Sequence, residues 1–541
     1  MIDRSKALGR VPSALPRALR WRRVAAAALS VALGLAAVQP PSADAQVRLP
    51  SLGESASDEV SVTAEKRLGD QVMRDIRRDP AYFDDPVLLE YLQSIWQPLV
   101  TAARQRGEIA ADIDAAFAWE SFLVRDRSVN AFALPGGYVG VHLALIGLTG
   151  SADELASVLA HELSHVTQRH IARSIVASQR QGLLALAGLI VGMVAASRSN
   201  NVDAANAAIV GSQAAAAQGQ LNFSRDMERE ADRIGIGVLQ QAGFATAGMS
   251  AMFEKLDQAH RINDSGAFPY LRSHPLTTER VAEARTRAAG AAMRSSGPTR
   301  LEHELMQSRS RVLMDPSAQA RRRLQELDVG AQGSAGRDRL AALYASAVAS
   351  MELRDFARAE RAWAEGLPLA ESLGREEVRA RHHWALLGAE LSLAQRDPAR
   401  ATQRVAAAGE MPSRPAMLLR AQIAVAAGDP AGLRRQAETL QAWVAERRHD
   451  ALAWTALSLC AEALGQKLRA VRAQAESHAA LGDLPGAIDR LRAGQRLARS
   501  GGASPDFIEA SVIDARLREL EAQRRQLLAD LRGNRPARDP E

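Results

Sequence analysis

His161, Glu162 and His165 form the pattern HExxH, the part of the sequence with the clearest chemical potential. Residues four apart on an α-helix share one face, so both imidazoles can reach the same metal ion. Glu162 adjoins the first histidine, where its carboxylate can take a proton from water on that ion. Zinc suits this chemistry because it lowers the pKa of bound water from about 16 to about 7. The pattern therefore predicts zinc-assisted hydrolysis, with two histidines, a carboxylate and an open fourth position.

A third ligand is needed, because HExxH alone arises by chance in many helical proteins. The metzincin pattern would place a histidine at position 171, which holds Ile171. In MEREADRIG, Glu228 and Asp232 are four apart and share a helix face, whereas Glu230 points away. We predict that Glu228 is the third ligand and that Asp232 orients a ligand imidazole by a hydrogen bond. Without HExxH, these acids would be interpreted as a solvated helix start.

Two further histidines are predicted not to be metal ligands. His170 follows His161 on the same predicted helix, about 180° round it, so we expect its side chain to face away from the metal. We interpret it as a surface histidine or as one that contacts a ligand rather than the ion. His142 lies on an apolar stretch, 137–145, and is expected to be structural rather than a ligand.

Helices must position these motifs. Apolar residues at helical spacing predict three helices, at 87–105, 153–176 and 227–243. Ser151 or Asp153 can cap the start of the second helix, and Gly243 can close the third.

Short strands are predicted at 117–124 and 137–145, near the turn Pro135–Gly136–Gly137. Zinc peptidases commonly hold an extended peptide beside an edge strand. We expect 137–145 to be that edge, and the substrate to bind there as an added strand.

An apolar segment, 183–196, and an Ala-rich segment, 205–217, separate the second and third helices. The first segment is too short to span a bilayer. We favour a buried helical hairpin packed against the flanking helices. The alternative is a hairpin that covers the active site or makes a peripheral contact with a lipid surface.

Beyond about residue 300, the sequence carries helical segments and no strand pattern. Turn signals recur at a spacing of roughly 34 residues, which is typical of tetratricopeptide-type helix pairs; they are Arg354–Asp355, Arg396–Asp397, Gly428–Asp429, Gly465 and, after about half a unit, Gly482–Asp483. The predicted fold class is therefore mainly α with a small β element, a zincin metalloprotease domain followed by an α-helical tetratricopeptide-like solenoid.

The first 45 residues have the order of a secretory signal peptide: a basic stretch, a short apolar run and small residues, with cleavage expected near Ala45. A membrane anchor is the alternative, but the apolar run is short for a span. The segment holds seven basic residues and two acids, so its removal reduces the formal net charge from +6 to +1. The high pI is then no argument for a nucleic-acid partner. Cys460 is the sole cysteine, which excludes an internal disulfide.

Four stretches carry a resemblance to a known family: NAFALPGGYVGVH (130–142), HELSHVTQRH (161–170), FSRDMEREADRIGI (223–236) and SHPLTTERVAEAR (273–285). In this order they resemble the gluzincin metallopeptidases of the HtpX and Oma type. With an export signal and helical repeats, the chain looks like the periplasmic β-barrel assembly-enhancing proteases of that family.

The resemblance implies one zinc per chain on His161, His165 and Glu228, with Glu162 as general base. It also implies that His274 occupies the fourth zinc position and holds the enzyme inactive. A transition-state role and a plain loop role for His274 stay open. Arg280 matches a family arginine near the active site, positioned to bind a carboxylate or stabilise an oxyanion.

We therefore expect an exported zinc endopeptidase that acts in the periplasm on unfolded or misassembled envelope proteins, with repeats that contact the barrel-assembly machinery. This task is implied by the resemblance alone. The alternative is a mainly non-catalytic chaperone or assembly scaffold, since a solenoid offers a long concave surface. The predicted domains are a signal peptide at 1–45, a metallopeptidase domain at 46–295, a repeat domain at 296–525 and a disordered tail at 526–541.

Overall fold

In a computed structural model of the chain, the structure describes residues 60–177, 225–262, 268–288, 295–334, 336–409, 411–499 and 506–533. The predicted signal peptide and the predicted hairpin at 183–217 lie outside the described residues. The fold class is confirmed as mainly helical, with one small sheet and a helical region after the segment that carries the HExxH motif.

The sheet has the strand order β1-β2-β4-β3. Strands β2 and β4 pair in parallel, whereas β1 pairs with β2 and β3 with β4 in antiparallel fashion. Gly136 and Gly137 both adopt positive φ in the turn between β3 and β4, a conformation that glycine adopts without steric cost. The strands are β1 (Tyr82–Phe83), β2 (Glu120–Val124), β3 (Ala131–Leu134) and β4 (Tyr138–His142).

The prediction that 137–145 forms the sheet edge is wrong. Strand β4 covers Tyr138–His142 and has a partner on each side, and the chain turns into a helix at Leu143. The edges of the described sheet are β1 and, next to β4, the four-residue strand β3; neither strand was predicted. The alternation of apolar and polar residues indicates which side chains of a strand are buried. It does not indicate which strands pair, so the strand order could not be predicted.

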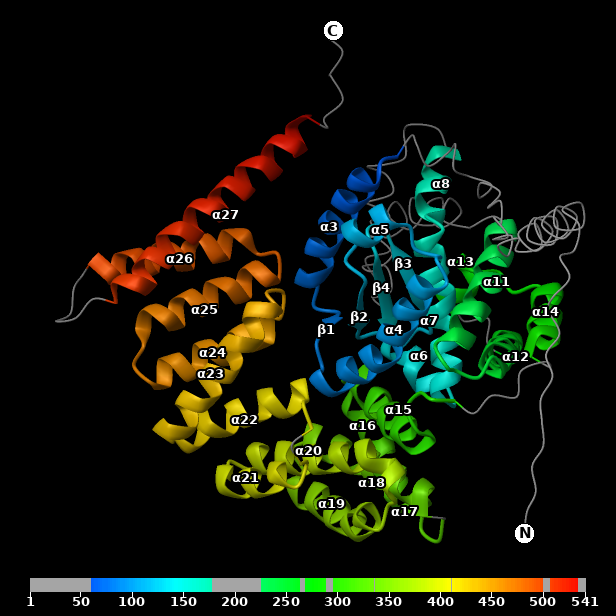
Figure 1. Ribbon diagram of the computed structural model, residues 1–541. Coiled ribbons are helices and arrows are strands. Elements are labelled where there is room, and N and C mark those ends of the chain that lie inside the picture. Colours follow the sequence, from blue (N-terminus) through cyan, green and yellow to red (C-terminus); the bar gives the residue numbers. More distant parts are fainter. Residues whose placement is uncertain are drawn as a thin grey trace, which may run out of the picture. The chain divides into compact units, whose positions relative to one another are not determined.

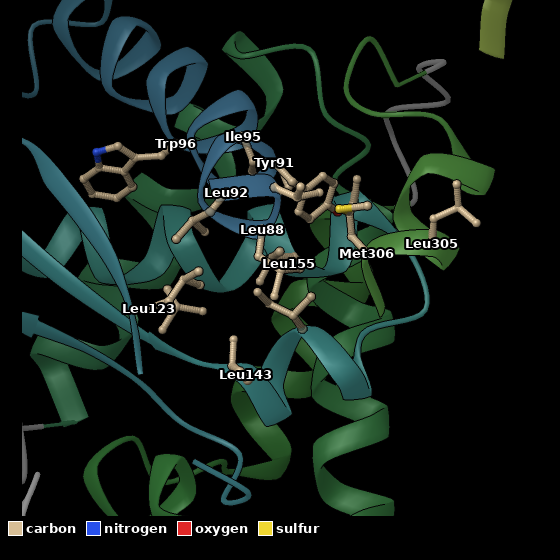
Figure 2. Close-up of a cluster of buried hydrophobic side chains, with 14 of the residues drawn as sticks. Leu88, Tyr91, Leu92, Ile95, Trp96, Leu123, Leu143, Leu155, Leu305 and Met306 are labelled. Atoms are coloured by element: carbon tan, nitrogen blue, oxygen red, sulfur yellow. The ribbon is translucent and has the colours of Figure 1, made fainter. Parts of the chain in front are cut away.

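The two faces of the sheet are covered by different helices (Figure 1). On one face, Phe122 and Tyr138 pack with Met73 and Ile76 of α3. On the other face, Leu123 packs in the main core with α4 and α7, as Figure 2 shows for Leu123, Leu92 and Leu155. This alternation follows from the two-residue period of a strand.

Ten helices accompany the sheet within the described part of the HExxH-bearing segment. They are α3 (Val62–Arg78), α4 (Pro86–Gln105), α5 (Ala111–Ala116), α6 (Leu143–Leu148), α7 (Ala152–Thr167), α8 (His170–Ala177), α11 (Arg225–Gln241), α12 (Ala247–Ile262), α13 (Pro269–Ser273) and α14 (Thr278–Ala288). The predicted helices at 87–105 and 227–243 are confirmed as α4 and α11. Ser151 caps α7, where its side chain accepts a hydrogen bond from the Glu154 amide.

The predicted helix at 153–176 is broken in two. Helix α7 ends at Thr167, and α8 begins at His170 after Arg169 adopts φ 51°. A non-glycine residue in this left-handed region is uncommon. An arginine side chain gives no indication of such a backbone conformation in the sequence. The direction of the His170 side chain was predicted from a continuous helix with 3.6 residues per turn. Because the helix breaks before His170, that prediction does not apply.

The predicted turns between the later helices are confirmed. Arg354, Arg396, Gly428, Gly465 and Gly482 all adopt positive φ. The first three are each followed by an aspartate, respectively Asp355, Asp397 and Asp429, whose side chain caps the next helix. A left-handed residue ends one helix and the capping aspartate starts its neighbour, which explains why these turns were visible in the sequence.

The helices of this region are α15 (Arg300–Met314), α16 (Ala318–Gln325), α17 (Leu327–Gly330), α18 (Gly336–Glu352), α19 (Phe356–Glu371), α20 (Val378–Ala394), α21 (Pro398–Ala406), α22 (Arg414–Ala427), α23 (Pro430–Glu446), α24 (Ala451–Ala463), α25 (Lys467–Ala480), α26 (Leu484–Arg499) and α27 (Phe507–Gly533), with one 3-10 turn, η1 (Arg375–Glu377). The predicted boundary at residue 525 falls inside α27, so 526–533 is helical rather than part of a disordered tail. None of the helices in the described ranges is long and apolar enough to cross a membrane.

Helix α15 connects the segment that contains the sheet with the helical region that follows it. It packs against both α6 and α18. Arg309 of α15 is buried, donates to both oxygens of Asp85 at the start of α4, and reaches Glu390 of α20. The apolar core continues through Leu305 and Met306 of α15 (Figure 2).

Candidate metal centre

Helices α7 and α11 bring the predicted ligands together. Their backbones approach closely at Gly235, where a Cβ atom would lie 3.2 Å from the carbonyl oxygen of Ala160. This contact lets His161 and His165 of α7 face Glu228 of α11. All residues of α7 except Asp153 are buried, His161 and His165 among them.

Four buried side chains, His161, His165, Glu228 and His274, form a group that could hold a metal ion. The Nε2 atom of His161 lies 3.0 Å from Nε2 of His165, 3.3 Å from Nδ1 of His274 and 3.5 Å from Oε2 of Glu228. Oε1 of Glu228 lies 3.4 Å from His165 Nε2 and 3.0 Å from His274 Nδ1. Ligands at the usual zinc distance stand about 3.3 Å apart in a tetrahedron. The donor set and its spacing therefore fit zinc.

Glu162 lies beside this group without taking part in it. Its side chain is fully buried, and the Ala133 backbone lies near enough to its carboxylate to lower the pKa. Burial raises the pKa of the Glu162 carboxyl, although His274 and His161 act in the opposite direction. A raised pKa suits a residue that must accept a proton.

Asp232 and Arg280 form the support behind His161. Oδ1 of Asp232 lies 2.9 Å from His161 Nδ1, and Arg280 donates to both Asp232 oxygens. Arg280 also lies 2.8 Å from Oε2 of Glu228. The hydrogen bond that was predicted for Asp232 is present, and the carboxylates that Arg280 contacts are the protein's own.

The site strongly favours positive charge. Burial by itself lowers the pKa of His161, but hydrogen bonds with Asp232 and Glu228 raise it to about 10. Burial would raise the pKa of Glu228, but His274 and His161 hold it well below its usual range. A cation at this place would compete with the proton on His161, so metal binding must release protons.

His274 directly follows α13, a short helix, at its C-terminal end. The side chain is buried, and its Nε2 lies 3.5 Å from Oε1 of Glu162. Tyr270 stacks beside it, with ring centroids 4.7 Å apart. Sequence reasoning missed Tyr270, because a tyrosine in a short turn-rich stretch carries no metal-site signal.

The other two histidines have different outcomes. His142 lies outside the four-residue group, and its Nδ1 contacts the Ser128 side chain and carbonyl at 3.1 Å. His170 does not face away as predicted. Its Nδ1 lies 2.8 Å from Nδ1 of His165, because the break at Arg169 redirects the chain.

Comparison with known proteins gives the family of the chain. Residues 90–288 match the model of peptidase family M48. The chain is 31% identical to the β-barrel assembly-enhancing protease of Escherichia coli (strain K12) over 497 residues, which is 91% of this chain and 95% of that protein. It is 38% identical to a putative β-barrel assembly-enhancing protease of Vibrio cholerae over 45% of this chain and 48% of that one. It is also 28% identical to the mitochondrial metalloendopeptidase OMA1 of Saccharomyces cerevisiae over 35% and 53% of the two chains. Together with the HExxH geometry, these similarities show that the chain belongs to peptidase family M48 and is a metallopeptidase.

Proposed function

We propose that this metallopeptidase is an endopeptidase that holds one zinc ion on His161, His165 and Glu228. The observation that carries the proposal is the spacing of their ligand atoms, which matches the edges of a zinc tetrahedron. When bound, zinc lowers the pKa of water and polarises a peptide carbonyl.

The roles of the surrounding residues follow from their positions. Glu162 accepts the proton of the attacking water, since it is buried and adjacent to the ligands. Asp232 keeps a hydrogen on Nδ1 of His161, which leaves Nε2 free to face the ion. Arg280 holds Asp232 and Glu228 in place.

The free edge of β3 is the proposed site for an extended substrate peptide. The His142 amide donates to the carbonyl of Asn130, the residue just before β3. Backbone groups along a strand point alternately toward and away from the neighbouring strand. The N–H and C=O groups of Ala131 and Ala133 therefore point away from β4. The Ala133 backbone lowers the pKa of Glu162, which supports an edge that passes the general base. A peptide added here would run beside the reacting groups.

The similarity to a β-barrel assembly-enhancing protease over nearly both full lengths supports a protease role in outer-membrane protein assembly. We propose that the chain is exported, with cleavage of the signal peptide near Ala45, and that it acts in the periplasm on misassembled envelope proteins. The helices from α15 onward would form the partner-binding region, as tetratricopeptide-like repeats that contact the barrel-assembly machinery.

Metal analysis tests the zinc site directly. The purified chain should contain about one zinc per molecule. His161→Ala should lose the metal, and His142→Ala, which alters a buried histidine outside the group, should retain it. A well-folded chain without zinc affinity would refute the proposal.

Glu162→Gln separates proteolysis from a scaffolding role. The variant keeps all three ligands and removes the proton acceptor, so it should bind zinc and lose activity about 10²- to 10⁴-fold. If this variant nevertheless reverses every defect of a deletion strain, the alternative function as a non-catalytic chaperone or scaffold is the main one.

A further inference from the structure

His170 and Glu230 lie behind the proposed ligand His165. Nδ1 of His170 is 2.8 Å from Nδ1 of His165, and its Nε2 is 3.1 Å from Oε2 of Glu230. The His170 side chain is fully buried, while Glu230 reaches the partly exposed Arg173 at 2.8 Å. The three side chains form a continuous series from the metal group outward.

The hydrogen positions on His165 and His170 follow if His165 binds the ion through one particular nitrogen. If His165 binds the ion through Nε2, its remaining hydrogen sits on Nδ1 and points at His170. His170 must then accept at Nδ1 and carry its own hydrogen on Nε2, which faces Glu230. Each contact thus has one donor and one acceptor, and a single tautomer satisfies each ring.

We propose that His170 is a positioning residue for the zinc ligand His165, and that Glu230 fixes the tautomer of His170. The proposal rests on the proposed zinc site. In this arrangement, each of the two ligand histidines is oriented by a carboxylate on the side away from the ion. Asp232 acts on His161 directly, whereas Glu230 acts on His165 through an intervening ring.

The break in the helix makes this contact possible. On a continuous helix, residues 165 and 170 would lie about 140° apart and could not touch. Arg169 instead adopts φ 51°, a left-handed conformation that is sterically unfavourable for a non-glycine residue. Its buried guanidinium donates to Oε2 of Glu65 at 2.8 Å and to the Val60 carbonyl at 2.5 Å.

Helix α3 therefore holds the break in place. Ile171, Ala172 and Ile175 of α8 pack with Val60, which precedes α3, and with Ala64 and Leu68 of α3. Glu65 also lies on α3, so the same helix provides an apolar contact and the ion pair. The ring of His170 is thereby fixed by α8 and α3, which contribute no metal ligand.

Zinc affinity and the visible spectrum of the cobalt(II)-substituted protein test the proposal. His170→Phe keeps a flat ring and removes the hydrogen bond, so it should weaken zinc binding about 10- to 100-fold and change the cobalt ligand-field bands. His170→Asn offers an acceptor near the position of Nδ1 and should recover most of both properties. A purely structural role predicts a lower unfolding temperature with unchanged zinc affinity and cobalt bands in the folded protein.

A second pair of variants covers the case in which His170→Phe does not fold. Glu230→Met removes the acceptor of His170 at a partly exposed position, and should weaken zinc binding in the same direction by a smaller factor. Arg173→Met removes the other partner of Glu230 and should leave zinc binding nearly unchanged. If the wild-type chain binds no zinc, the proposed function fails; if it binds zinc and Glu230→Met matches it in affinity and cobalt spectrum, only this inference fails.

Discussion

Arg280 and Asp232 form a buried ion pair with two hydrogen bonds, from Nε to Oδ2 at 2.6 Å and from Nη2 to Oδ1 at 2.9 Å. Oδ1 of Asp232 also faces His161, and Nη1 of Arg280 reaches Glu228 and the Pro275 carbonyl. One planar guanidinium therefore fixes both a proposed ligand and the partner of another ligand. Lysine lacks this fork and cannot replace it.

Arg280→Lys should consequently lower zinc affinity, by about 10- to 100-fold, as is typical when the partners of metal ligands are altered. Arg285→Lys is the matched control, because Arg285 lies on the same helix in an exposed ion pair with Glu254. Titration with a zinc-competing chelator measures both variants. A fall in kcat with unchanged zinc affinity would instead assign Arg280 to oxyanion stabilisation.

His274→Ala and His274→Arg should raise basal proteolysis or self-cleavage. The His274 ring adjoins Glu228, His161 and Glu162, so as a fourth ligand it would exclude the water that Glu162 must deprotonate. Movement of the α13 stretch would then be a condition for turnover. Activity that falls while zinc is retained would support a transition-state role, and unchanged zinc affinity and turnover would exclude both roles.

Ala133→Pro should impair peptide cleavage while the zinc content stays near that of the wild type. Proline removes an amide hydrogen that faces the free edge of β3, and it leaves the pairing of β3 with β4 intact. It also removes the backbone group that lowers the pKa of Glu162, so equal activity of the two variants below is the decisive outcome. We expect kcat/KM for an extended peptide to fall about 10-fold or more, since an added strand depends on main-chain hydrogen bonds. Ala133→Val, which retains the amide, is the control. Equal activity of the Pro and Val variants would exclude β3 as the substrate edge.

Glu302 should make the stability of the fold sensitive to acid. It is fully buried on α15 and pairs with Arg379 and His383 of α20. Burial would raise its pKa, but His383 and Arg379 hold the pKa below the usual value of 4.5. A carboxyl with a depressed pKa stabilises the folded state above about pH 4.5, and this contribution is lost as the pH falls through the folded-state pKa.

Urea unfolding of Glu302→Gln between pH 3 and pH 7 measures this contribution. At pH 7 the variant should be less stable by about 1–3 kcal/mol, and the difference should shrink as the pH falls below 4.5. Glu446→Gln, at an exposed position, should follow the wild type at every pH. A constant difference between wild type and Glu302→Gln would contradict the role of the ion pair.

Local interactions made much of this protein readable from its sequence. The placement of His161 and His165 on one face follows from the helical repeat, and the same rule separated Glu228 and Asp232 from Glu230. The turns of the helical region were visible because a left-handed residue and a capping aspartate act within four residues of each other. Such features depend on backbone geometry and near neighbours alone.

Contacts between distant segments decided the rest. Which strand forms the edge depends on how β2, β3 and β4 pair, and alternation within one strand does not encode its partners. The position of His170 depends on Arg169, whose unusual backbone conformation is held by Glu65, a residue on another helix. The partners of Arg280 likewise exist only once α11 and α14 meet. The sequence by itself determined which groups could do chemistry, and the tertiary structure decided how each is held, because those restraints come from residues far away along the chain.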